Sequence, residues 1–208
     1  MRGSRMGDKP QGTIKERLSA LQAQQRRQER RRRIAVIGVS VTGVGALAAA
    51  VTVFWLEDRA RTSLDAVQTV NVTQRNHTSK PVTYPQAPPV GSDHSPAWQN
   101  CGVYTDPIRN ENAVHSQEHG AVWVAYRPGL PKEQLDMLLD QARGRDFVLL
   151  SPYPGLSSAV ALNSWGKQLK LDSADDPRLP VFLRTNINGS GTPEPGATCT
   201  GGVGEPSA

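Results

Sequence analysis

IAVIGVSVTGVGALAAAVTVFWL, the stretch from Ile34 to Leu56, decides the first part of the fold because its 23 residues carry no charge. A helix of this length extends about 35 Å, which is enough to cross the ~30 Å hydrocarbon core of a bilayer. Its glycines would weaken a soluble helix but are common in lipid, where every backbone group must bond within the helix. We therefore predict one transmembrane helix over residues 34–56.

The charges on either side of this stretch predict its orientation. Residues 1–33 hold eleven Lys/Arg and three Asp/Glu, and the run ends in four arginines, whereas Glu57 and Asp58 follow the apolar stretch. By the positive-inside rule, residues 1–33 form a basic cytoplasmic tail and the C-terminal part lies outside the cell membrane. The alternative is a cleaved secretory signal, whose apolar region usually spans about 7–15 residues behind a short basic stretch. The longer run here favours an uncleaved, single-pass anchor.

The remainder of the chain is mildly acidic, although the whole protein has a net charge of +5 and a pI near 9.5. Residues 34–208 hold 13 Lys/Arg and 16 Asp/Glu. A nucleic-acid-binding domain needs its basic patch on the folded part, and here the basic residues are concentrated in the tail. We expect the membrane as a partner, another envelope protein as the candidate protein partner, and no nucleic acid.

Beyond the apolar stretch, the sequence divides into three parts. Residues 57–79 resemble a stalk, residues 80–187 a folded extracytoplasmic domain, and residues 188–208 a flexible tail rich in Gly and Pro. The domain has strand-like patterns at 121–126, 147–150, 159–163 and 168–171 and helical spacing at 131–143 and 176–184. This order predicts an α+β fold, a small sheet with helices packed on one face.

The two cysteines, Cys101 and Cys199, both fall on the side of the membrane that we expect to be oxidising. Cysteine pairs in such a compartment tend to form disulfides. The alternatives are two free thiols or two metal ligands, which the compartment favours less. We predict a Cys101–Cys199 disulfide.

Three of the four histidines, His94, His115 and His119, lie within 26 residues. The pattern H-x-x-E-H at 115–119 places His115 and His119 on one face if the segment is helical, and about 13 Å apart if it is extended. In the helical case, the three imidazoles are candidate ligands for Zn(II) or Cu(II), with Asp93 and Glu118 behind them. The same pattern occurs in a class of zinc peptidases, but those need a long helix and a further carboxylate. The stalk histidine, His77, receives no role.

Four stretches of the domain resemble one protein family. They are PPVGSDH at 88–94, CGVY at 101–104, ENAVHSQEHGAV at 111–122 and ALNSWG at 161–166. Together they are similar, over about residues 80–186, to the uncharacterised bacterial family known as domain of unknown function 3105. The resemblance implies a membrane-anchored extracytoplasmic domain, found largely in actinobacteria, with a shared histidine-rich element and no established activity. The family usually has Leu where Gln117 stands and Ser-Gly-x-His where this chain has Gly-Ser-Asp-His at 91–94; neither departure removes a histidine.

Two classes of function follow from these observations. The first is a membrane-tethered metal-binding domain, whose histidines must converge. The second is a non-catalytic envelope interaction module, whose histidines point apart or each bond their own acceptor. An enzyme ranks third, because it needs an open coordination position in a pocket.

Overall fold

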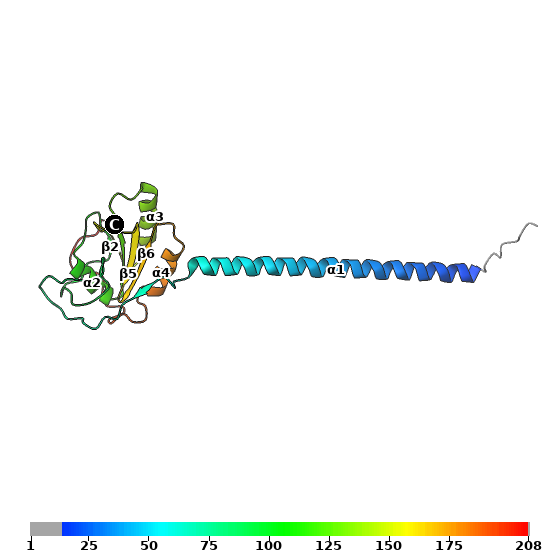
Figure 1. Cartoon of the computed structure of the whole chain (residues 1–208), viewed down its shortest axis with the longest axis horizontal. Helices are drawn as coiled ribbons and strands as arrows, with labels where there is room; N and C mark the ends of the chain where they lie inside the picture. The colour runs from blue at the N-terminus through cyan, green and yellow to red at the C-terminus, as the bar shows by residue number, and fades with distance from the viewer. Residues whose placement is uncertain (1–13, 208) are drawn as a thin grey trace, which may run out of the picture. The chain divides into compact units, whose positions relative to one another are not determined.

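The structure is a computed structural model that describes residues 14–207 of the chain (Figure 1). The chain divides into two compact units, Met1–Asp58 and Arg59–Ala208. The predicted span, residues 34–56, lies within the long helix α1 (Ile14–Thr62). By length and composition this helix is able to cross a membrane, although a signal sequence near the N-terminus meets the same criteria. Its large apolar side chains are exposed, with Phe54 at 68% and Trp55 at 69%.

The second unit is built on a mixed six-stranded sheet, in which four strands match the sequence predictions. The strands in chain order are β1 (Gln68–Thr69), β2 (Gly102–Val103), β3 (Val122–Tyr126), β4 (Val148–Pro152), β5 (Val160–Ser164) and β6 (Lys167–Leu171). Their order in the sheet is β1-β6-β5-β3-β4-β2. The pairs β3–β4 and β2–β4 are parallel, and the other three pairs are antiparallel. The fold is therefore α+β, as predicted.

The sheet has two differently covered faces, because side chains alternate along a strand. Val122 and Val124 belong to the apolar core under helices α3 (Lys132–Ala142) and α4 (Arg178–Asn186). Trp123 and Ala125 pack instead against α2 (Asn110–Glu118). In Figure 1, α2 accordingly lies on the other side of β5 from α4. Helices α3 and α4 thus share one face as expected, and α2 adds a third helix on the opposite face.

Helix α2 is buried on all sides, from Glu111 to Glu118. Ala113 contacts the sheet. Polar side chains of the helix bond the surrounding loops: Ser116 Oγ donates to the Gln99 carbonyl at 2.7 Å, and Gln117 Nε2 to the Pro89 carbonyl at 3.0 Å. The helix therefore lacks the apolar stripe that marks a surface helix.

The segments on either side of the predicted domain also contact it. In the predicted stalk, β1 pairs with β6, and the Thr78 amide donates to the His94 carbonyl at 2.7 Å. The Cys101–Cys199 disulfide is present, with Cα atoms 5.4 Å apart. Residues 188–207, expected to be flexible, bond the domain beyond that bridge; the Ser207 amide, for example, donates to the Val103 carbonyl at 2.7 Å.

Candidate metal centre

Four side chains of the second unit bring their ligand atoms together. His77, His94, His115 and Glu118 each offer one atom, and these atoms all lie within 4.8 Å of one another. They come from three segments: His77 from the region before the predicted domain, His94 from the loop ahead of β2, and the other two from α2. Only His77 is substantially exposed, with 50% of its side chain accessible against 0% for His94.

Helix α2 settles the spacing question raised by the H-x-x-E-H pattern. Residues 115 and 118 are helical, and His119 is the C-cap with φ −74° and ψ −6°. Residues three and four positions apart lie on one face of a helix. The Nε2 atoms of His115 and His119 are accordingly 3.0 Å apart. His119 thus borders the group of four without belonging to it.

The Nδ1 atoms of three histidines point at backbone carbonyls. His94 Nδ1 lies 2.8 Å from Ser92 O, His115 Nδ1 2.7 Å from Ser95 O, and His119 Nδ1 2.7 Å from Thr198 O. A carbonyl oxygen only accepts, so each Nδ1 carries the proton and donates it. In a neutral ring the other nitrogen, Nε2, then carries a lone pair. This arrangement, with Nδ1–H on a backbone carbonyl and Nε2 free, is the one that orients metal-ligating histidines.

The Nε2 atoms meet groups that do not complement a lone pair. His94 Nε2 lies 2.9 Å from Glu118 Oε2, and His77 Nε2 lies 3.6 Å from the same oxygen. His115 Nε2 faces His119 Nε2. Because Nδ1 of His94, His115 and His119 already donates, the His94–Glu118 and His115–His119 contacts each place two electron-rich atoms opposite each other. Such contacts require a positive charge between the atoms, which is either a proton or a metal ion.

Burial keeps His115 in the form that binds metals. It lowers the pKa of His115 to about 4 by desolvating the charged ring, and the neighbouring His119, His94 and His77 act in the same direction. The hydrogen bond to the Ser95 carbonyl opposes this shift. His115 is therefore neutral at pH 7 with its Nε2 lone pair available.

The two predicted supporting residues, Asp93 and Glu118, differ in their relation to the group of four. Glu118 contributes a carboxylate oxygen at ligand distance. Asp93 bonds no histidine that the structure describes; its Oδ1 accepts from the Asn76 amide at 2.8 Å and from Asn76 Nδ2 at 2.9 Å. It thereby holds the residue next to His77. His77 itself was missed from the sequence because residues 57–79 resembled a stalk.

Three imidazoles and one carboxylate form a donor set that suits Zn(II), and Cu(II) accepts the same donors. Ligand atoms at 2.0–2.1 Å from a tetrahedral zinc ion lie about 3.4 Å apart. The contacts of 2.9 and 3.6 Å to Glu118 bracket that spacing. The four residues are therefore able to hold one metal ion.

The comparisons with known proteins add a family. A family model described as "Protein of unknown function (DUF3105)" matches residues 76–201. That range includes all four residues of the group, His119 and both cysteines. No curated protein and no solved structure matches the chain.

Proposed function

This chain belongs to the DUF3105 family of proteins of unknown function, and from that premise we propose that it is a membrane-anchored protein binding one Zn(II) or Cu(II) ion outside the cytoplasm. The ligands in this proposal are His77, His94, His115 and Glu118. With four protein ligands the coordination sphere is closed, which is typical of structural or storage sites.

One observation carries the proposal: the ligand atoms of three histidines and one glutamate lie within 4.8 Å of one another. His94 and His115 donate their Nδ1 protons to backbone carbonyls and turn Nε2 toward the same group. A metal ion bound by His94 and Glu118 would replace the unfavourable 2.9 Å contact between these two residues by coordinate bonds. The buried carboxylate of Glu118 would also offset part of the ion's charge.

The anchoring and its orientation rest on the helix and the disulfide. Helix α1 has the length and composition of a span, and the basic residues of positions 1–33 favour a cytoplasmic N-terminus. The Cys101–Cys199 disulfide is typical of an oxidising compartment. Together these features support a single-pass protein with its C-terminal unit outside.

The alternative is an envelope interaction module with purely structural histidines. The Nδ1 hydrogen bonds fit that alternative, because each ring has an acceptor of its own. The gathering of four ligand atoms from three segments within 4.8 Å of one another is more than such bonds require. The convergence therefore favours the metal.

The test is the zinc and copper content of the full chain, purified in detergent with its disulfide intact. We expect one equivalent of metal in the wild type and none in a His94→Ala/His115→Ala double variant. Glu118→Gln should lose most of the metal. Glu111→Gln is the matched control, because Glu111 is also a buried acid of α2 but bonds Arg109 and the Val82 amide. Equal metal content in all four folded proteins, or none in the wild type, would rule out the site.

A further inference from the structure

The C-terminal segment 194–199 closes the end of the helix that carries the metal ligands. The last carbonyls of a helix have no partner within it. In α2, the Glu118 carbonyl accepts from the Glu194 amide at 3.0 Å and the His119 carbonyl from the Gly196 amide at 3.3 Å. His119 Nδ1 in turn donates to the Thr198 carbonyl. This segment therefore positions the turn that holds Glu118.

The disulfide is the covalent attachment that keeps this segment in place. Residues 187–207 contain no helix or strand that the structure assigns as an element. Cys199 directly follows Thr198 and is bonded to Cys101, whose amide also donates to the Cys199 carbonyl at 2.8 Å. Cleaving the bridge would leave this segment attached by hydrogen bonds alone, such as those of Gly202 and Val203 with the segment before β2.

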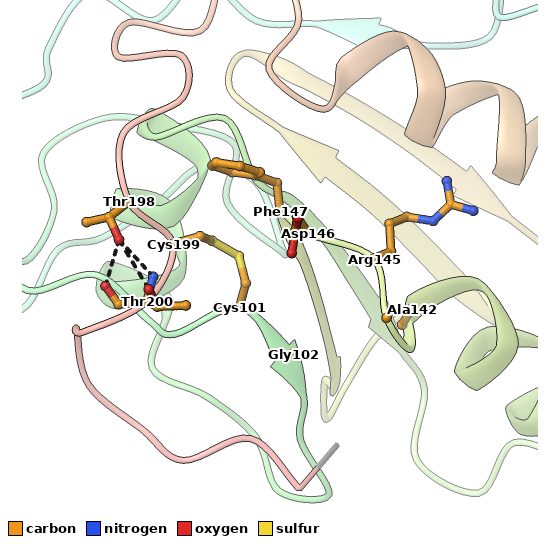
Figure 2. Close-up of a pocket in the computed structure, with 10 residues that line it drawn as sticks. Cys101, Gly102, Ala142, Arg145, Asp146, Phe147, Thr198, Cys199 and Thr200 are labelled. Carbon is orange, nitrogen blue, oxygen red and sulfur yellow. Dashed lines mark hydrogen bonds between the residues drawn. A yellow bond between two sulfur atoms is a disulfide. The ribbon is translucent and has the colours of Figure 1, made fainter.

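The same disulfide is accessible from a pocket. Figure 2 shows it beside Phe147 and Thr198, with Arg145 farther along. The pocket has a volume of about 470 Å³, which is within the range of small-ligand sites. Both cysteines line it; Cys101 is half-buried and Cys199 is buried. The bridge therefore forms part of the wall of this pocket.

We propose that the Cys101–Cys199 disulfide is a thiol-exchange site for a dithiol protein, and that its reduction weakens metal binding by removing the covalent attachment that holds segment 194–199 against α2. This inference rests on the proposed metal function. In the exchange, a partner thiolate attacks Sγ of Cys101 and displaces the Cys199 thiolate, which takes up a proton. The partner's second thiolate then attacks the partner's first sulfur, which is bonded to Cys101 in the mixed disulfide. This displaces the Cys101 thiolate, which is also protonated. The partner leaves oxidised to a disulfide, and this chain gains two electrons and two protons.

The coupling is tested by zinc affinity of the full chain in detergent, measured by competition with a chromophoric chelator. A Cys101→Ser/Cys199→Ser variant avoids thiols that would bind zinc themselves. We expect it to bind zinc about tenfold more weakly, as when an outer-shell partner is lost. Circular dichroism shows whether this variant is folded.

A second pair of variants keeps the disulfide and removes one contact. Glu194→Pro deletes the amide that bonds the Glu118 carbonyl, and Pro195 already restricts residue 194 to an extended backbone. Glu194→Ala is the matched control, because it removes the side chain and keeps the amide. We expect zinc affinity about fivefold lower for Glu194→Pro than for Glu194→Ala, the effect of one hydrogen bond.

Accessibility is tested by treating the folded chain with dithiothreitol and counting alkylated thiols by mass. We expect reduction within about tenfold of the rate for the urea-unfolded chain, as for an exposed bridge. A folded chain that resists reduction, or equal zinc affinities for the two Glu194 variants, would overturn the inference while leaving the metal site intact. A wild-type chain without zinc would instead end the proposed function, and this inference with it.

Discussion

The two faces of the sheet are covered in opposite ways. Under α3 and α4 most buried side chains are aliphatic or aromatic, among them Leu138, Phe182 and Leu183, and Asn186 is the buried amide of α4. Against the other face, α2 buries a histidine, two glutamates, two amides and one hydroxyl. Burying a polar group costs free energy unless it is hydrogen-bonded, whereas burying apolar area stabilises by about 25 cal/mol per Å². Burial on the apolar face therefore stabilises the fold, and the polar face, which carries the candidate metal ligands, depends on that stability.

The largest expected effect is on the apolar face. Phe182→Ala should lower the free energy of unfolding by about 3–5 kcal/mol, because it leaves a cavity where a fully buried ring packed. Urea unfolding of the full chain in detergent measures this change, and Phe182→Leu should cost much less. The folded Phe182→Ala fraction should still bind zinc. A large loss of zinc affinity in that fraction would mean that the two faces are not separable.

The second effect is a pH dependence confined to the polar face. The pKa of His115 is lowered from its ordinary value of 6.5 to about 4. Between these pH values the unfolded chain binds a proton that the folded chain does not. The contribution of His115 to the free energy of unfolding is therefore fully present above pH 6.5 and is lost as the pH falls to 4. The loss is roughly 3 kcal/mol in metal-free protein. Unfolding of His115→Gln over the same pH range should show a shallower decline, and an identical decline would contradict this assignment.

The third effect is stabilisation by metal. At a free zinc concentration 100 times the Kd, the free energy of unfolding should rise by about 2.7 kcal/mol, because zinc binds only the folded site. His94→Ala should abolish the gain. His77→Ala should reduce it while leaving the metal-free stability nearly unchanged, because half of the His77 side chain is exposed. Thermal unfolding with and without zinc checks all three chains; equal gains would place the ion elsewhere.

The smallest effect lies on the outer surface of α3. Lys132 and Asp136 form an i,i+4 ion pair with side chains 80% and 50% exposed. Lys132→Ala should change the free energy of unfolding by less than about 0.5 kcal/mol, because solvent screens such pairs. It should leave zinc affinity unaltered. A change above 1 kcal/mol would show that this part of the apolar half carries more than packing.

The two faces of the sheet also differ in how well the sequence predicts their secondary structure. The apolar half was predicted from sequence because Leu135, Leu138 and Leu139 repeat at helical spacing and β3 is a continuous apolar run. Helix α2 was left open between helix and extended chain, because burial on all sides removes the periodicity that marks a helix.

The candidate site was only partly predictable for a related reason. The spacing of His115 and Glu118 placed both near a metal once the segment was helical. His77 joins them through a bridge to His94, formed by backbone bonds between segments 17 residues apart. Such a pairing leaves no pattern in the side chains of either segment. The contacts of segment 194–199 were missed likewise, because they use backbone amides and carbonyls that any residue supplies.

The pairing of β1 with β6 has a mechanical consequence. A pull on residue 62 acts first on segment 63–79, which is attached by the two residue pairs of β1, the Val70–Gly166 hydrogen bond and the bonds around Asn76 and Thr78. These attachments follow one another along the segment, so tension would peel them away in turn rather than break them together. If His77 binds a metal ion, its coordinate bond would be stronger than the hydrogen bonds that precede it along the segment. The force needed to detach segment 63–79 as far as His77 would then depend on whether the metal is bound.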